Sequence, residues 1–266
     1  MGTPRESIRL VDESGTIRLR TVKTGVDQTA SMTAYASRKT TALAGEDLCG
    51  YVLKKDSPSC GMTRVKVYRG KEPGRRVGVG LFAQALLARF PHLPVEEEGR
   101  LTDPRLRENF IERVFAYRRL RDLFESRWSI ADLVRFHTAH KLVLLAHSMQ
   151  AYTRLGRLVA GAKAAERVAL RSHYTAGFMD ALATIATPKR HTNVLQHMAG
   201  YFKKSLDAAS RDELLASIED YRLGLVPLIV PVTLLRHHVR AHDVQYLAGQ
   251  IYLAPHPKEL MLRNHV

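Results

Sequence analysis

A change of hydrophobic pattern near residue 100 constrains the fold of this chain more than any other feature. Before it, short runs rich in β-branched and aromatic residues alternate with two helical stretches. After it, nearly every segment repeats its apolar residues with the period of a helix. The pattern predicts an α/β N-terminal part, a partial Rossmann-like layer, followed by an all-α helical bundle.

The predicted boundaries follow from caps and turns. We expect strands over residues 8–11, 16–22, 51–53, 64–68 and 93–96, with helices over 29–44 and 79–89. Thr102 or Asp103 can cap the next helix, with Pro104 at its first position, and Ser129 caps the one after it. Further helices are predicted over 149–160, 163–186, 190–204, 210–225 and 229–248. The expected organisation is an α/β part over 1–100, a connecting helix over 101–128 and a helical domain over 129–266.

The composition bears on partners more than on fold. The chain is 45% hydrophobic, enough to bury a core, and its formal net charge is +15. Residues 1–100 hold 17 Lys and Arg against 11 Asp and Glu, and residues 101–266 hold 24 against 15. Because both parts are basic, a polyanion such as nucleic acid can lie across both.

The chain has two cysteines, Cys49 and Cys60. Two are too few for a disulfide framework or a complete four-cysteine metal site. The first residues lack the apolar core of a signal peptide, and no run of 18 or more apolar residues occurs. We therefore expect a cytoplasmic protein with no membrane partner.

The most informative short segment is residues 50–61, where an apolar run stops at a Ser-Pro turn that carries Cys60. A turn after a strand is where α/β proteins place chemistry, so this thiol is a candidate ligand or nucleophile. Ser57 and Ser59 flank Pro58. Their hydroxyls either bond the turn backbone or lie near a substrate.

Residues 53–61, Leu-Lys-Lys-Asp-Ser-Pro-Ser-Cys-Gly, resemble the signature of the thiouracil desulfidase family, and the similarity continues through residues 78–83 and 90–101. The resemblance implies a 4Fe-4S cluster held by three cysteines, the last of which matches Cys60. Its open iron takes sulfur from a thiolated uracil. A serine at this turn, Ser57 or Ser59, is implied to lie near the substrate.

The family places its other two cysteines upstream, one near the N-terminus and one in a Cys-Pro-Glu motif. Residues 1–6 resemble what normally follows that motif, and Cys49 falls where the family has no ligand. The resemblance therefore implies either that the true start lies upstream or that this is a non-catalytic copy. We expect this chain by itself to hold no cluster and to be inactive.

Residues 78–83, Gly-Val-Gly-Leu-Phe-Ala, match a dinucleotide-binding fingerprint, but no predicted strand precedes them directly. A helix that begins at two glycines can still bind a phosphate.

His137, His140 and His147 fall within an arc of about 80° on one predicted helix, among leucines. Three interpretations remain open: a metal site, a buried hydrogen-bonded seam, or a groove that faces a ligand. About 10 Å of helical rise separates His140 from His147, which is too far for easy sharing of one ion.

Residues 191–204 combine imidazoles, an amide, aromatic rings and lysines, a mixture that suits RNA because rings stack on bases and lysines meet phosphates. The alternative is an amphipathic helix with a solvated basic end. The candidates for contacts to bases or ribose are His191, Asn193, His197 and Tyr201. The candidates for phosphate contacts are Lys203, Lys204, Arg236 and Arg240.

Four stretches, residues 136–160, 191–206, 221–235 and 246–255, resemble the YbgA-type helical domain. Behind a desulfidase domain, this domain is associated with removal of sulfur from 4-thiouridine in tRNA, where it is thought to grip the RNA. The full-length function implied is a tRNA 4-thiouridine desulfidase. The alternatives are a non-catalytic tRNA-binding module and a desulfidase of free thiouracil or its nucleotide.

Overall fold

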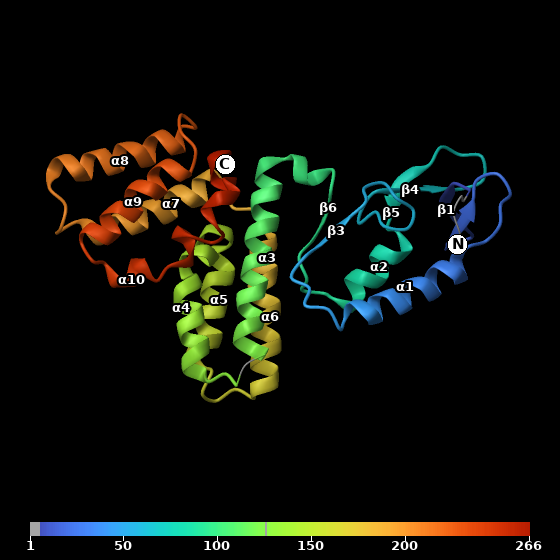
Figure 1. Cartoon of the computed structure of the whole chain (residues 1–266), viewed down its shortest axis with the longest axis horizontal. Coiled ribbons are helices and arrows are strands. Elements are labelled where there is room, and N and C mark those ends of the chain that lie inside the picture. Colours follow the sequence, from blue (N-terminus) through green and yellow to red (C-terminus); the bar gives the residue numbers. More distant parts are fainter. Residues whose placement is uncertain (1–5, 126) are drawn as a thin grey trace. The chain divides into compact units, whose positions relative to one another are not determined.

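The computed structural model describes residues 6–125 and 127–266. The chain divides into two compact units, residues 1–102 and 103–266 (Figure 1). The first unit is α/β and the second is all-α, which confirms the predicted fold class. The helix expected to connect two domains, Pro104–Glu125 (α3), is part of the second unit.

The first unit holds a four-stranded mixed sheet and a separate two-stranded parallel sheet. The mixed sheet has the order β2-β1-β4-β5, with strands Ile8–Glu13 (β1), Thr16–Thr21 (β2), Val65–Tyr68 (β4) and Arg75–Gly78 (β5). β1 pairs antiparallel with β2 and parallel with β4, and β4 pairs antiparallel with β5. The predicted Rossmann-like layer is therefore two small sheets rather than one parallel sheet.

One face of the mixed sheet forms the core of this unit. Leu10, Leu19, Val65 and Val67 are buried and pack with Met32 of the helix Thr29–Leu43 (α1). Successive residues of a strand point to opposite faces, so the residues between these leucines and valines lie on the other face of the sheet.

The small parallel sheet pairs Tyr51–Leu53 (β3) with Val95–Glu97 (β6). The helix Leu81–Arg89 (α2) comes between them in sequence and packs against α1. Because parallel strands end at the same edge, the segments that follow β3 and β6 are brought together.

The second unit is built only of helices. In Figure 1, α3, α4, α5 and α6 run side by side as a bundle, and α7, α8 and α9 pack together next to it. Besides α3, its α-helices are Ile130–His147 (α4), Met149–Ala160 (α5), Arg167–Ala183 (α6), Pro188–Ala199 (α7), Ala208–Arg222 (α8), Ile229–Ala241 (α9) and Gln245–Ala248 (α10).

The helix starts follow the predicted capping chemistry. The carboxylate of Asp103 accepts hydrogen bonds from the amides of Arg105 and Leu106. Ser129 and Asp132 form a reciprocal capping box at the start of α4. Of the two caps considered for α3, Thr102 and Asp103, the structure shows Asp103, and Ser129 is confirmed as the cap of α4.

One strand of the structure was not predicted, and one predicted helix is divided into two. β5 was not expected, because its sequence Arg-Arg-Val-Gly is charged and follows a proline. It is an edge strand, where charged residues face solvent. The single helix expected over 229–248 breaks between α9 and α10 at Asp243, whose φ of 48° is incompatible with a continuing helix.

Within the described parts of the chain, no helix is both long and apolar enough to cross a bilayer.

Candidate functional site

The segment between β3 and β4 carries the predicted Ser-Pro-Ser-Cys turn, and residues 56–61 are called the cysteine loop below. It leaves the carboxyl end of β3, beside the end of β6, where α/β folds place their ligands. Glu97, the last residue of β6, is 2% exposed, and its Oε1 accepts a hydrogen bond of 2.7 Å from the amide of Met62. A buried carboxylate therefore fixes the end of the loop.

Hydrogen bonds within the loop orient the Cys60 thiol. The hydroxyl of Ser57 accepts from the Cys60 amide at 3.2 Å and lies 3.0 Å from the hydroxyl of Ser59. The Ser59 hydroxyl in turn lies 3.3 Å from the Cys60 sulfur. The Gly61 amide closes the turn on the carbonyl of Ser57 at 2.8 Å. The two serines thus hold the turn, as one interpretation proposed, and Ser59 also touches the thiol.

The start of α2 packs directly on this loop. The carbonyl of Ser59 accepts from the amides of Phe82 and Ala83, at 2.9 and 3.2 Å. A Cβ at Gly80 would lie 2.4 Å from that carbonyl, so this approach requires glycine. The helix amides that could bind a phosphate are therefore occupied by the cysteine loop, and neither the dinucleotide nor the phosphate interpretation of residues 78–83 is supported.

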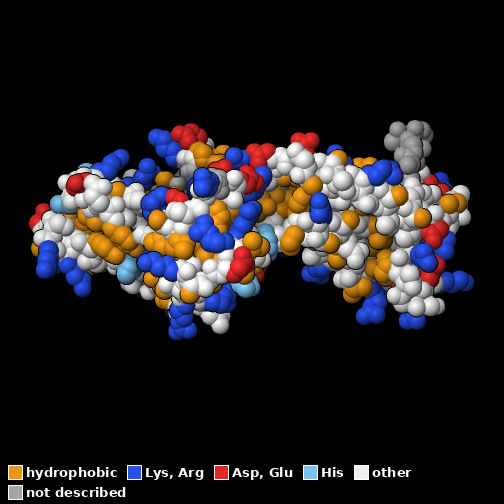
Figure 2. All heavy atoms as spheres, turned by 90° about the horizontal axis from the view of Figure 1, so that it is seen from below, with side chains coloured by type: hydrophobic (Ala, Val, Ile, Leu, Met, Phe, Trp, Pro, Cys, Tyr) orange, Lys and Arg blue, Asp and Glu red, His pale blue; other side chains and the backbone are white. Residues whose placement is uncertain are grey.

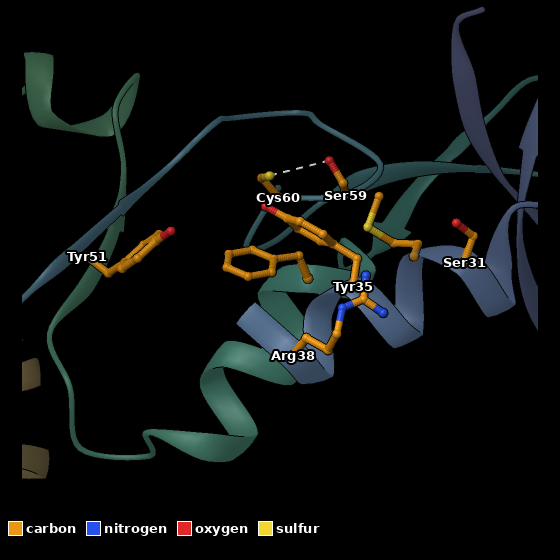
Figure 3. A pocket seen from close by; sticks show the side chains of 8 residues that line it. Ser31, Tyr35, Arg38, Tyr51, Ser59 and Cys60 are labelled. Atoms are coloured by element: carbon orange, nitrogen blue, oxygen red, sulfur yellow. Dashed lines mark hydrogen bonds between the residues drawn. The ribbon is translucent and has the colours of Figure 1, made fainter. Parts of the chain in front are cut away.

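A cavity of about 430 Å³ opens beside the loop. Figure 3 shows Tyr35 and Arg38 extending from α1 toward Ser59 and Cys60, while Tyr51 reaches in from β3. The ring of Phe82 lies between the two tyrosines, with centroids 6.3 Å from Tyr35 and 6.1 Å from Tyr51.

The cavity combines flat rings, a thiol and a cation. Burial raises the pKa of Tyr51, and the nearby Cys60 and Tyr35 raise it further, so its phenol is a neutral hydrogen-bond donor near pH 7. A flat heteroaromatic ring can stack on the aromatic side chains. The hydroxyls and the Arg38 guanidinium can form hydrogen bonds with the polar edge of such a ring. The lining therefore suits a flat heteroaromatic ring beside the Cys60 sulfur.

Tyr35, Arg38, Tyr51 and Glu97 were not singled out from the sequence. Tyr35 and Arg38 stand on one face of a helical stretch at i and i+3, a weak signal by itself. Glu97 lies in a run of three glutamates that follows an apolar segment, and buried carboxylates at such a point need a partner.

The donor set was compared with the 4Fe-4S cluster that the sequence resemblance implies. A cubane cluster is held by several cysteine thiolates, and Cys60 is the one cysteine among the residues that line the cavity. Cys49 is half-buried just before β3 and does not line it. Over the described residues no group of three His, Cys, Asp or Glu could hold a metal ion. The residues present at the cavity therefore do not fit the cluster.

In the helical unit, the histidines of α4 form a buried, hydrogen-bonded seam. His137 Nδ1 lies 3.1 Å from the Tyr174 hydroxyl, His140 Nδ1 is 2.7 Å from the Phe136 carbonyl, and His147 Nε2 is 3.1 Å from Glu112. Burial opposes ionisation of Glu112, but the hydrogen bond and charge of His147 lower its pKa to about 2. The same contact raises the pKa of His147. Of the three open interpretations, the buried seam fits these contacts.

The residues predicted to contact RNA differ in how far they are buried. His191 is buried, with Nδ1 2.8 Å from the Tyr252 hydroxyl, so it is unavailable to a base and leaves the candidate set. Arg236 is half-buried and lines a cavity against the C-terminal segment, apart from the exposed Arg240. Besides Arg240, the exposed candidates are Asn193 and His197 on α7, Tyr201 on the short 3-10 turn Gly200–Phe202 that follows it, and Lys203 and Lys204 directly after that turn.

These exposed residues include an aromatic platform that the sequence did not reveal in full. Tyr201, 42% exposed, stacks on Tyr246 of α10 with centroids 5.3 Å apart and planes 15° apart. His197 meets Tyr201 edge-on at 5.7 Å. Lys203 and Lys204, both exposed, follow the 3-10 turn that carries Tyr201, so two cations stand within three residues of the platform.

Fold and site define a two-part protein, with a thiol-bearing cavity in an α/β unit and an all-α unit with a basic, aromatic surface. Residues 1–98 match the family described as 2-thiouracil desulfurase, and residues 141–257 match a family described as protein of unknown function, DUF1722. The chain is 33% identical to the "Uncharacterized protein YbgA" of Escherichia coli (strain K12) over 161 residues, which are 60% of this chain and 95% of that protein. No solved structure matches.

The chain therefore belongs to the YbgA family and joins that helical domain to a 2-thiouracil desulfurase-family segment. Both resemblances seen in the sequence are confirmed. The family of the first segment supports removal of sulfur as its role at family level.

Proposed function

We propose that this protein is of the tRNA 4-thiouridine desulfidase type: the first unit receives a thiolated uracil and the helical unit holds the RNA. The observation that carries the proposal is the cavity of about 430 Å³ in which Cys60 faces aromatic rings. Its size and lining suit one base, and the matched family is described by the same class of substrate.

The residues of this chain account for binding and orientation. Tyr35, Tyr51 and Phe82 offer faces and edges to a pyrimidine ring, as base-binding pockets do. Ser59 is a donor to the ring's polar edge or to its sulfur, and it lies within hydrogen-bond distance of Cys60. The Ser57 hydroxyl stabilises the turn by accepting the hydrogen bond from the Cys60 amide.

The RNA part of the proposal rests on the helical unit. Proteins bind single-stranded RNA with exposed aromatic rings, on which bases stack, and with nearby cations, which contact phosphates. The aromatic platform and the two lysines offer both. The net charge of +15 adds a long-range attraction, and Figure 2 shows Lys and Arg side chains on the visible face of both units. These features favour tRNA over free thiouracil as the ligand.

The test compares three ligands for the full chain: tRNA that contains 4-thiouridine, the same tRNA without sulfur, and free 4-thiouracil. We expect the tightest binding for thiolated tRNA, with the preference over sulfur-free tRNA reduced in Cys60→Ser and kept in Cys49→Ser. Equal binding of the two tRNAs contradicts the cavity's role. Tighter binding of free thiouracil favours a desulfidase of the free base.

The single cysteine in the cavity supports a second candidate, a non-catalytic tRNA-binding module. It is tested by reconstitution of the 266-residue chain with iron and sulfide under anaerobic conditions. We expect no stoichiometric cluster and no sulfide release from thiolated tRNA, because one thiolate cannot hold a cubane. A stoichiometric cluster would make Cys49 or the histidines ligands and would restore the enzyme.

A further inference from the structure

The outer face of the mixed sheet carries a row of cations, one from each strand. Arg9 of β1 is the register partner of Arg20 of β2, and Lys66 of β4 is the partner of Arg76 of β5. Leu10 pairs in parallel with Val67, which places Arg9 beside Lys66. With strands about 4.8 Å apart, the row spans about 14 Å across the sheet.

This face is opposite the core. Leu10, Val65 and Val67 are buried between the row's positions, so strand alternation puts Arg9 and Lys66 on the other side of the sheet. Like charges directly opposite each other across strands cost stability. A sheet that places four cations in register therefore needs compensating anions.

The anions of this unit compensate only the two ends of the row. Arg20 pairs with Glu13, and Arg76 Nη1 lies 2.6 Å from Asp56. Among the described residues no carboxylate pairs with Arg9 or Lys66 in the middle. The Arg9 guanidinium lies 5.2 Å from the centroid of the Tyr68 ring, and its buried Nε has no hydrogen-bond partner.

The middle of the row lines a hollow of about 290 Å³, whose polar lining comes from Arg9, Lys66, Arg76, Tyr68 and Asp56. Pro58 of the cysteine loop also lines it, whereas Ser59 and Cys60 line the cavity described above. The cysteine loop thus separates a basic hollow from the thiol cavity.

We propose that this face, centred on Arg9, Lys66 and Tyr68, binds the phosphate backbone of single-stranded RNA next to the base-binding cavity. Cations in a groove track phosphates, and an aromatic ring beside them can stack a base; here Tyr68 is the half-buried ring that lines the hollow. The two uncompensated cations, Arg9 and Lys66, line the hollow together with the Tyr68 ring, and cations beside a ring favour a nucleotide chain over a free phosphate ion. The inference rests on the proposed function in taking RNA as the substrate, but it assigns RNA contact to the first unit rather than to the helical unit alone.

The test uses the full chain and a short uridine-rich RNA without sulfur, so that it does not depend on desulfidation. Binding is measured between 50 and 200 mM salt for the wild type, Lys66→Gln, Lys66→Arg and the control Lys39→Gln. Lys39 is an exposed lysine on α1, outside the sheet. Loss of one phosphate contact lowers the log–log salt slope by about one. We expect that loss in Lys66→Gln, a wild-type slope in Lys66→Arg and no change in Lys39→Gln.

Two outcomes overturn the inference. An unchanged slope in Lys66→Gln removes the sheet face from RNA binding, while the preference for thiolated tRNA can still hold and leave the proposed function standing. A second arm titrates inorganic phosphate and uridine monophosphate. If either binds the wild type and is weakened by Lys66→Gln while the RNA slope is unchanged, the hollow is a small-phosphate site.

Discussion

His137, His140 and His191 are held neutral by the core of the helical unit. Burial lowers the pKa of His137 and of His140 to about 4, and that of His191 to about 3. The Nε2 atoms of His137 and His140 have no hydrogen-bond partner, so a proton there would be buried without compensation. These side chains stabilise the fold only in their neutral form.

This burial predicts acid sensitivity of the helical unit. In the unfolded chain these histidines bind protons below about pH 6.5, while the folded chain resists until about pH 4. Unfolding therefore takes up protons, and stability falls as the pH falls through this window, by up to about 1.4 kcal/mol per unit for each group. We expect the thermal midpoint of the helical signal in circular dichroism to drop between pH 6.5 and 4.

His140→Phe separates this effect from general acid denaturation. It removes one titrating group at similar volume, so the pH slope should become shallower. His173→Phe, at an exposed position of α6, serves as the control and should keep the wild-type slope. The explanation fails if His140→Phe and the wild type have parallel pH profiles.

Glu97 holds the end of the cysteine loop through the amides of Met62 and Thr63, which both donate to its Oε1. Its carboxylate accepts the Met62 amide at 2.7 Å in a buried setting. A buried amide left without an acceptor costs about 1–3 kcal/mol. We expect the Met62 amide to exchange with solvent deuterium about ten to a hundred times faster in Glu97→Ala, as measured by NMR.

Glu97→Gln is the matched variant, because its side-chain oxygen can still accept the same amide. Its exchange rate should stay close to the wild type. Equal exchange in Glu97→Ala and the wild type would show that the loop is held by other contacts.

At the scale of elements, the junction of the cysteine loop with α2 depends on glycine. A Cβ at Gly80 would lie 2.4 Å from the Ser59 carbonyl carbon and oxygen, and neither backbone atom can move without displacing the loop. We expect Gly80→Ala to destabilise the first unit by about 1–3 kcal/mol, the usual range for overpacking. Protease resistance of residues 6–102 is the measurement.

Gly45→Ala is the control for that substitution. A Cβ at Gly45 meets its nearest atom, the Ala42 carbonyl oxygen, at 3.5 Å, which is ordinary contact. It should leave protease resistance unchanged. Equal resistance of both variants would mean that α2 can move away from the loop at little cost.

The elements also show what the sequence could and could not predict. The sequence predicted the caps and the turn that carries Cys60, because such features depend on residues that are close in sequence. The caps are Asp103 and Ser129. β5 was missed because edge strands tolerate charged residues. Glu97 was missed because its partner, the Met62 amide, is 35 positions away. Tyr35 and Arg38 reach the cavity only through the packing of α1, which local patterns do not encode.

The same limit explains why His191 and Arg236 were named as RNA contacts from the sequence. Both lie in segments whose composition suits RNA, and composition alone does not tell which face of a helix is buried. His191 turns inward to Tyr252, and Arg236 faces the C-terminal segment. Asn193 and His197 on α7, Tyr201 on the 3-10 turn after it and the two lysines beyond that turn are exposed.

At the scale of the whole molecule, the net charge of +15 attracts tRNA, but only some of the Lys and Arg side chains should contact its phosphates. Lys203 and Lys204 follow the stacked pair Tyr201 and Tyr246 and are the lysines expected to meet phosphates. We predict that Lys203→Gln/Lys204→Gln lowers the log–log salt slope of tRNA binding by about two. Lys163→Gln/Lys189→Gln removes the same charge at exposed positions and should lower the affinity slightly without changing the slope. Equal effects of the two double variants would mean that tRNA senses the net charge rather than this surface.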